Sequence, residues 1–311
     1  MDLNFVQLIF TLRLEADISD RYALFAMKPY FEQSFRQAAG CGGGLTGPCT
    51  SENGCPYHLT FSQPLSADPA ALKRYQKPSL PFVFQLQLLP EPPNEGDTVE
   101  LGLVLTGSAV NLVTGYIAAL EGMLRIPAFR RRFTAALIKV ESAGYDRCRT
   151  LVMTPGKGMA MDRVTTLSMQ GLRESAVLAP DAVTVTVVTP MRIMTQGRPL
   201  REFSFSPFIR ALFRRVSAMA YYYGGSEAEL DFKWLAEQSR SVACADADFQ
   251  WIEWGGSWSG LVGSATFTGN MTEYHPFLLA GEYLHVGKGA TFGLGRYAVR
   301  ACKRDDSGYT C

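Results

Sequence analysis

The alternation of apolar and polar positions is clearest between residues 181 and 301. Val183, Val185 and Val187 alternate with threonines, the two-residue period of a β-strand. A helix is predicted to begin at Ser206-Pro207, a cap followed by a proline at the first helical position, and to end near residues 223–225. Further strands are predicted at about 248–254, 260–268 and 293–301, with a helix at about 273–281. The order strand, helix, strand, strand, helix, strand is that of a ferredoxin-like, RRM-like domain.

The first half of the chain predicts the same order less regularly. Strands are predicted at 3–14, 57–62, 81–89 and 98–106, and helices at 20–39 and 108–124. A segment rich in glycine, proline and cysteine follows the first helix and interrupts the pattern. We therefore expect an α+β protein with two tandem ferredoxin-like domains and antiparallel sheets. The expected domains are 1–178, with a cysteine-containing insertion, and 179–311, with a glycine-rich loop.

Composition and charge narrow the possible functions. The 311 residues fit two domains, and the 47% hydrophobic residues are enough for packed cores. A net charge of +1 argues against non-specific coating of nucleic acid but permits a local basic site. No apolar run approaches the roughly 18 residues of a membrane helix. The start of the chain does not read as a secretory signal, and seven cysteines is an odd number, so we expect a cytoplasmic, reduced protein with no membrane partner.

A glycine-rich loop precedes the last predicted strand. It reads Gly-Lys-Gly at 287–289 and Gly-Leu-Gly at 293–295, and Arg296 follows. Glycines permit positive φ and leave backbone N–H groups uncovered, and arrays of such groups bind phosphate oxygens. The loop lacks the spacing of a P-loop. The alternative interpretation is a tight structural turn before an edge strand.

The sequence resembles the CRISPR-associated precursor-RNA-processing endoribonucleases of the RAMP superfamily. The resemblance lies in five segments: 189–193, 197–200, 205–215, 277–289 and 291–297. It implies recognition of CRISPR repeat RNA and one metal-independent cut per repeat, in which a ribose 2′-hydroxyl attacks the adjacent phosphate to leave a 2′,3′-cyclic phosphate. The partners it implies are repeat RNA, the crRNA product and other CRISPR effector subunits.

Two other functions stay open. One is a non-catalytic RAMP subunit that binds RNA as a scaffold in an interference complex. The other is an enzyme of a different class that uses the ferredoxin-like fold for a small ligand, although the sequence contains no nucleotide or cofactor motif that we recognise.

Basic residues are predicted to hold the RNA together with the glycine loop. The predicted RNA-binding residues are Gly287, Lys288, Gly289, Gly293, Gly295, Arg296, Arg192, Arg210, Arg214 and Arg215. Arginine suits bidentate contact with phosphate. For any one of these arginines the alternative is a solvated helix face.

The chain contains only three histidines: His58, His275 and His285. The family often places a histidine in or just after the first helix, but residues 20–39 contain none and offer Tyr22 and Lys28 instead. We expect His58 to act as the general acid or base, assisted by Tyr22 and Lys28, with His285 as the rival. A third possibility is that no histidine acts, and that lysine and arginine only orient the RNA and stabilise charge.

Cys41, Cys49 and Cys55 lie within fifteen residues of the predicted insertion. Thiolates bind zinc, and His58 could supply a fourth ligand, although the cysteine spacings are longer than those of common zinc knuckles. A structural zinc is therefore one interpretation, and a loop that binds no metal is the other. No cofactor is expected to be needed for cleavage.

Overall fold

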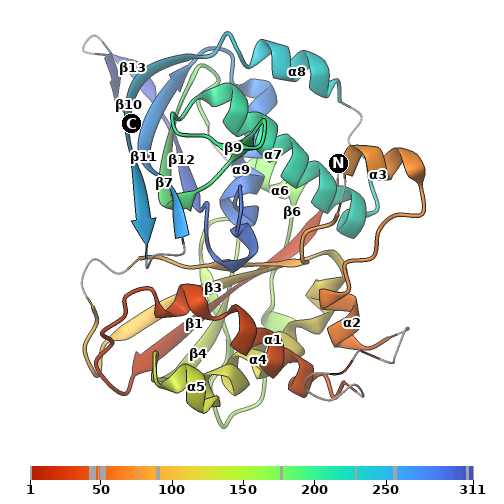
Figure 1. The fold of residues 1–311 in the computed structure, drawn as a ribbon, viewed down its shortest axis with the longest axis vertical. Helices are drawn as coiled ribbons and strands as arrows, with labels where there is room; N and C mark the ends of the chain where they lie inside the picture. The colour runs from red at the N-terminus through yellow and green to blue at the C-terminus, as the bar shows by residue number, and fades with distance from the viewer. Residues whose placement is uncertain are drawn as a thin grey trace. The chain divides into compact units, whose positions relative to one another are not determined.

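The structure is a computed structural model. It describes residues 2–41, 47, 49, 54–75, 77–88, 92–175, 178–227, 230–254, 258–305 and 308–310. Contacts divide the chain into two units, which we call the first domain (Asn4–Leu167) and the second domain (Met1–Leu3 with Ser168–Cys311). Figure 1 shows the elements of both domains.

The first domain contains a six-stranded sheet. Its strands are β1 (Asn4–Leu14), β2 (Phe82–Gln85), β3 (Thr98–Thr106), β4 (Ala135–Ala143), β5 (Arg149–Met153) and β6 (Thr166–Ser168). They follow the order β2-β3-β1-β4-β5, and β6 also pairs with β1. The neighbours along this path are antiparallel. The order β2-β3-β1-β4 is that of a ferredoxin-like unit, to which β5 adds one strand.

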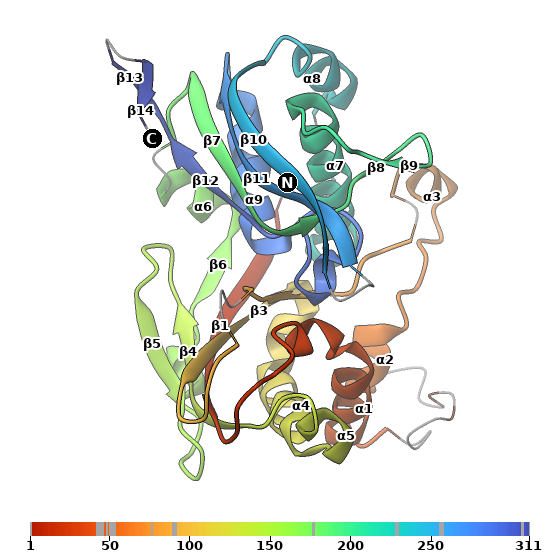
Figure 2. The same ribbon diagram turned by 60° about the vertical axis from the view of Figure 1, so that its left-hand side comes forward.

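Helices cover one face of this sheet (Figure 2). The longer helices are α1 (Lys28–Ala38) and α4 (Val113–Arg125), which pack against each other. Shorter helical segments are η1 (Ala23–Ala26), α2 (Pro56–Phe61), α3 (Pro69–Tyr75), η2 (Gly107–Leu112), α5 (Pro127–Arg130) and η3 (Met161–Arg163). Phe31 of α1 meets Phe84 of β2 edge to face, with ring centroids 4.8 Å apart, and Phe35 meets Tyr116 of α4 at the same distance. Aromatic packing therefore joins both helices to the sheet.

Two predictions in the first domain are wrong in detail. Residues 57–62, predicted as a strand, belong largely to helix α2, because Pro56 opens a helical turn and Tyr57 stacks on Phe61 one turn later, at 5.0 Å. The predicted helix 20–39 is divided into η1 and α1. Pro29 stands in the first turn of α1, where a continuous α-helix from residue 20 would require a backbone N–H that proline lacks.

The second domain contains an antiparallel four-stranded sheet in the order β10-β11-β7-β12. Its strands are β7 (Ala182–Met191), β10 (Ala243–Trp254), β11 (Trp258–Thr268) and β12 (Tyr297–Ala301). Helices α7 (Phe205–Met219) and α9 (His275–Leu284) lie on one face (Figure 2). Val183, Val185 and Val187 are buried in the core on this side, as their alternation predicts. Both domains are thus ferredoxin-like, and the predicted fold class is confirmed.

Smaller elements complete the second domain. They are α6 (Met169–Ser175), β8 (Met194–Thr195), β9 (Arg198–Pro199), η4 (Ala220–Gly224), α8 (Phe232–Gln238), η5 (Thr272–Tyr274), η6 (Ala290–Phe292), β13 (Lys303–Asp305) and β14 (Gly308–Thr310). The start of α7 differs slightly from prediction, because Ser204 rather than Ser206 precedes the helix with extended backbone. Within the described part of the chain, no helix is long and apolar enough to cross a membrane.

The second domain contains residues that come before the first domain in the sequence as well as residues that come after it. Residues 168–175, predicted to belong to the first domain, group with the second, and Met169 lies in its core. Leu3 is fully buried in the same core, and its carbonyl accepts a hydrogen bond from the Met169 N–H at 3.3 Å. The Asp2 N–H donates to Ser226 Oγ at 2.8 Å. The chain therefore leaves the second domain after Leu3 and returns to it at Ser168.

Candidate nucleic-acid interface

The glycine loop has a backbone conformation that few other residues adopt. The φ angles are 95° at Gly287, 83° at Gly289, 93° at Gly293 and 65° at Gly295. Positive φ brings a Cβ atom into conflict with the backbone, so each position favours glycine. The glycines set the path of the loop.

Close packing gives a second reason for two of these glycines. A Cβ atom on Gly287 would lie 2.7 Å from the Arg192 carbonyl oxygen, and one on Gly295 would lie 1.8 Å from the Val286 carbonyl oxygen. Any side chain at these positions would force the backbone apart. The loop is therefore packed directly against the segment that follows β7.

Hydrogen bonds fix the loop to the end of β7 and to the residue that follows it. The Lys288 N–H donates to the Arg192 carbonyl at 2.9 Å, and the Gly295 N–H donates to the Pro190 carbonyl at 3.1 Å. These N–H groups, expected from the sequence to meet phosphate, are satisfied within the protein. The Lys288 side chain and Gly289 form the exposed tip of the loop. The cation at this tip, more than an array of backbone amides, is therefore what the loop offers to a ligand.

His285 lies in the turn that joins α9 to the glycine loop. Its ring is fully buried, and its φ of 54° is unusual for a residue with a side chain. Burial holds the pKa of His285 well below its usual range, and the charges of Arg296 and Arg215 lower it further. A neutral, buried imidazole supports the loop from beneath and offers no accessible surface to RNA.

The predicted arginines occupy two kinds of environment. Arg215 is partly buried, and its Nε donates to the Leu284 carbonyl at 3.1 Å, so it braces the end of α9. Burial lowers the pKa of Arg215 to about 10, which leaves it charged at neutral pH. Arg210 and Arg214 are exposed one turn apart on α7. Burial lowers the pKa of Arg214, as does the neighbouring charge of Arg210, and within the described residues neither forms an ion pair.

Near Arg192 lies Arg201, a basic residue that the predicted site did not include. The Arg192 Nη1 lies 3.4 Å from Ser259 Oγ in β11, while its Nε is buried without a hydrogen-bond partner among the described residues. Trp251 lies on the neighbouring strand β10, and the guanidinium of Arg201 lies 3.6 Å from the centre of its ring. The sheet register pairs Trp251 with Leu261, and Leu261 with the residue before Arg192. A cation stacked on an aromatic ring therefore lies at the same end of the sheet as the glycine loop.

The predicted catalytic residues do not gather at one point. Lys28 begins α1, and Tyr22 precedes η1, whereas His58 lies in α2 beside the cysteines that follow the end of α1. An 11-residue helix is about 16 Å long, so Lys28 and the cysteine group stand at opposite ends of α1. His58 is partly exposed. The remaining histidine, His275, is also partly exposed, but its Nε2 lies 3.1 Å from the Ala179 carbonyl.

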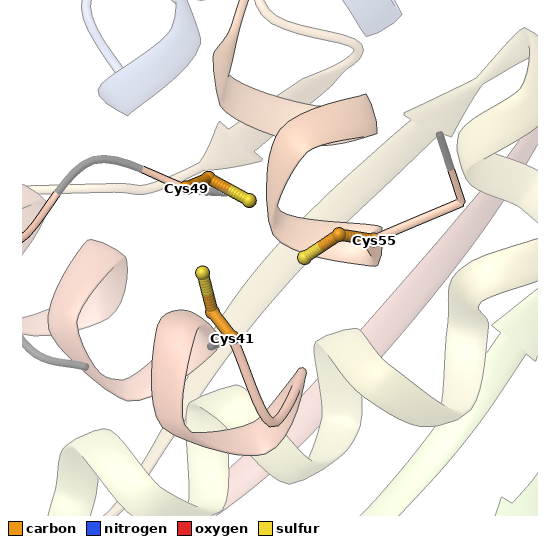
Figure 3. Close-up of side chains that lie close together, drawn as sticks. All are labelled: Cys41, Cys49 and Cys55. Carbon is orange, nitrogen blue, oxygen red and sulfur yellow. The ribbon is translucent and has the colours of Figure 1, made fainter. Parts of the chain in front are cut away.

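The three predicted metal ligands do converge. The Sγ atoms of Cys41, Cys49 and Cys55 all lie within 4.8 Å of one another (Figure 3). None of these three cysteines forms a disulfide, nor do Cys148 and Cys244, whereas Cys302 is disulfide-bonded. Burial on its own raises the pKa of the Cys55 thiol, but the backbone amides of His58 and Tyr57 and the two neighbouring thiols outweigh it and lower the pKa.

Two family models match the sequence. One, described as "CRISPR-associated endoribonuclease Cas6", matches residues 185–297. Another, described as an "N-terminal domain", matches residues 3–165, which is more than half of the chain. No curated protein matches the sequence significantly. The two models thus correspond closely to the two domains.

Solved structures of Cas6 proteins share the fold. A Cas6 in a product complex superposes with a TM-score of 0.56 at 14% identity, covering 95% of this chain and 100% of its own. A Thermus thermophilus Cas6 gives 0.53 at 15% identity, over 96% of this chain and 99% of its own. A chain of a partial Cas6-RT-Cas1–Cas2 complex gives 0.57 at 14% identity, over 96% of this chain and 46% of its own. At such identities the structures establish the fold.

The chain is built from two ferredoxin-like domains, a fold that it shares with the Cas6 structures. The second domain matches the family model of the CRISPR-associated endoribonuclease Cas6.

Proposed function

We propose that this chain binds CRISPR repeat RNA through the second domain and cleaves it to release guide RNA. The observation that carries the proposal is the rigid glycine loop, which presents Lys288 at an exposed tip beside Arg192. Exposed Arg210 and Arg214 extend the positive charge along α7. Such cations bind the phosphates of RNA, whereas the Arg201–Trp251 pair offers a surface on which a base can stack.

The names of the structural relatives support the proposed partners. One relative is a Cas6 in a product complex, and another belongs to a Cas6-RT-Cas1–Cas2 complex. We infer that repeat RNA, its crRNA product and other CRISPR proteins are the partners of this chain.

The proposed reaction needs no metal. The 2′-oxygen forms a bond to the adjacent phosphorus while the bond from phosphorus to the 5′-oxygen breaks, leaving a 2′,3′-cyclic phosphate and a 5′-hydroxyl. A base removes the 2′ proton and an acid protonates the 5′-oxygen. His58 is the histidine we propose for one of these transfers, because it is partly exposed and, unlike His285, not enclosed in a core. A lysine or arginine would stabilise the charge on the phosphate.

A second function is favoured by one observation. Because Tyr22 and Lys28 lie away from His58 along α1, the described residues of the first domain do not show an assembled group of these three side chains. A RAMP subunit that binds RNA without cutting it requires only the second-domain surface. This scaffold function is the alternative that the experiment must distinguish.

The deciding experiment is single-turnover cleavage of repeat RNA, with EDTA added together with the RNA and affinity measured separately. We expect cleavage in EDTA with a 2′,3′-cyclic phosphate end, a large loss of rate in His58→Ala, and binding close to that of wild type. Tyr22→Phe and Lys28→Ala test the assisting roles, and His285→Asn tests the rival. Tight binding without any cleavage would establish the scaffold function. Cleavage by His58→Ala at the wild-type rate would remove His58 from the mechanism.

A further inference from the structure

Three separate pieces of the first domain bring their thiols together. Cys41 follows the end of α1, Cys49 stands in the connecting segment, and Cys55 immediately precedes α2. Cys41 and Cys55 are each 9% exposed, and the three sulfur atoms point toward a common centre (Figure 3). Three converging thiols without a disulfide form a set of metal ligands rather than a scatter of core residues.

The distances fit one small ion. Four ligands placed tetrahedrally about 2.3 Å from a zinc ion lie about 3.8 Å from one another. The sulfur atoms here lie within 4.8 Å of one another, so a small contraction would place all three around a single ion. An iron–sulfur cluster would hold its cysteines farther apart, because several atoms separate them. Thiolate ligands select zinc over magnesium or calcium.

We propose that Cys41, Cys49 and Cys55 bind one Zn²⁺ ion, and that this ion fastens α2 to the end of α1. Among the described residues, no further cysteine, histidine, aspartate or glutamate joins the group. The site is structural, and its support is the geometry of the three thiols rather than the proposed RNA function.

A bound ion would strengthen the attachment of α2 to α1. Between Ala38 and Pro56, the described residues form no helix or strand. Side-chain contacts of Tyr57 already attach α2 to α1. Its hydroxyl donates to Glu32 at 2.9 Å, and its ring lies 4.2 Å from the Arg36 guanidinium. The ion would add a second attachment, at the residue where α2 begins.

Metal content of the full chain tests the site. We expect about one zinc per chain by elemental analysis when the protein is produced with zinc in the medium. Cys41→Ser, Cys49→Ser and Cys55→Ser should each lose most of it. Cys148→Ser and Cys244→Ser are matched controls, because both cysteines are free and exposed, and they should keep the wild-type content. After metal removal, added Co²⁺ should give the intense thiolate-to-cobalt absorption and the visible bands of a tetrahedral site.

Three results would overturn the site. They are wild-type protein that neither contains zinc nor binds added Zn²⁺ or Co²⁺, metal retained equally in all three cysteine variants, or an intact mass showing a disulfide within the group. If a cysteine variant fails to fold, the metal is instead removed from wild-type protein with a chelator, which leaves the sequence unchanged.

Hydrogen exchange tests the fastening of α2. On removal of zinc from wild-type protein, amides of 56–61 should exchange at least tenfold faster, while those of α7 in the second domain stay unchanged. Readdition of Zn²⁺ should restore the protection. Equal protection of α2 with and without the metal would contradict its role as a fastener.

Discussion

Gly295 and Lys288 occupy the same loop but have opposite surroundings. Gly295 is buried with positive φ and has no space for a Cβ atom, whereas Lys288 projects from the exposed tip. The first residue therefore determines whether the loop forms, and the second determines what the loop can bind.

We predict that Gly295→Ala and Lys288→Ala both weaken RNA binding, for different reasons. Gly295→Ala should also lower the thermal midpoint of unfolding, because the Cβ atom would collide with the Val286 carbonyl. Lys288→Ala should leave the midpoint unchanged and cost about 1–3 kcal/mol of binding free energy, the range for a charged hydrogen bond. Calorimetry and RNA titration measure the two effects. Gly158→Ala, at an open position with ordinary φ, is the control. Unchanged affinity in Lys288→Ala would exclude the tip as a phosphate contact.

A second prediction concerns His285 and pH. Burial beside Arg296 and Arg215 keeps its ring neutral in the folded state, whereas in the unfolded chain it takes up a proton near pH 6.5. Below that pH the unfolded state binds more protons than the folded state does. The free energy of unfolding therefore decreases by up to about 1.4 kcal/mol for each unit by which the pH falls. Denaturant titrations between pH 7.5 and 5 should show this slope.

His285→Asn removes the titrating ring, while asparagine still tolerates positive φ. The variant should show a flatter pH dependence, although His275, whose pKa is also lowered by burial, keeps part of the slope. A slope that is the same in His285→Asn and wild type would contradict the assignment.

The sequence indicated the glycines but not how their N–H groups are used. Glycine content alone does not reveal which amides donate within the protein, and here the partners of Lys288 and Gly295 come from a segment about 100 residues earlier. His285 could not be separated from His58 by sequence, because the burial of His285 depends on how the whole loop folds over it.

At the level of elements, α7 carries charge on one side and apolar residues on the other. The spacing of Ile209, Leu212 and Val216 by three and four residues places them on one side of α7, and all three are buried. Arg210 and Arg214 are one turn apart on the other side, and both are exposed. Regular periodicity over four turns made this helix predictable.

We predict that Arg210→Gln and Arg214→Gln each weaken RNA binding and make it less dependent on salt. Removing one interaction between a cation and a phosphate should reduce the slope of log affinity against log salt by about 0.7–0.9. Stability should not fall, because the two guanidinium groups lie near each other and lack ion-pair partners among the described residues. Titrations at several salt concentrations measure the slope. Arg163→Gln, a substitution of an exposed arginine in the first domain, is the control and should leave the slope unchanged. If Arg210→Gln and Arg214→Gln have the same slope as this control, this side of α7 does not contact phosphates.

Helix α2 shows where periodicity fails. In 57–61, aromatic and aliphatic residues alternate with His58 and Thr60, which is strand-like over so short a run. The structure forms a helix, and its one deeply buried residue is Thr60 rather than an apolar one. Six residues do not distinguish the two periods, and the position of α2 depends on contacts with α1 that are remote in sequence.

At the scale of the whole molecule, the sequence predicted two ferredoxin-like domains, and the structure contains them. It did not predict that Leu3 belongs to the second. The apolar pattern of 3–14 is continuous, so the residue where the chain passes between domains leaves no local signal. Only the packing of Leu3 beside Met169 reveals it.

We predict that Leu3→Ala destabilises the second domain, although Leu3 adjoins the first strand of the first. Truncating a fully buried leucine costs about 2–5 kcal/mol. Hydrogen exchange should accelerate in α7 and β7 and remain unchanged in β3. Leu65→Ala, at a side chain that is 58% exposed, is the control. Faster exchange confined to the first domain would contradict the division of the chain at this residue.

This division has a consequence for synthesis on the ribosome. Asp2 and Leu3 are made before the first domain, but their partners Met169, Gly224 and Ser226 are made only after that entire domain. The first domain can fold as it emerges, while its leading residues wait for the second domain to appear. Ribosome-bound chains that stop before residue 168 should therefore contain a folded first domain that begins with an exposed leucine, and their release from chaperones should follow the synthesis of α7.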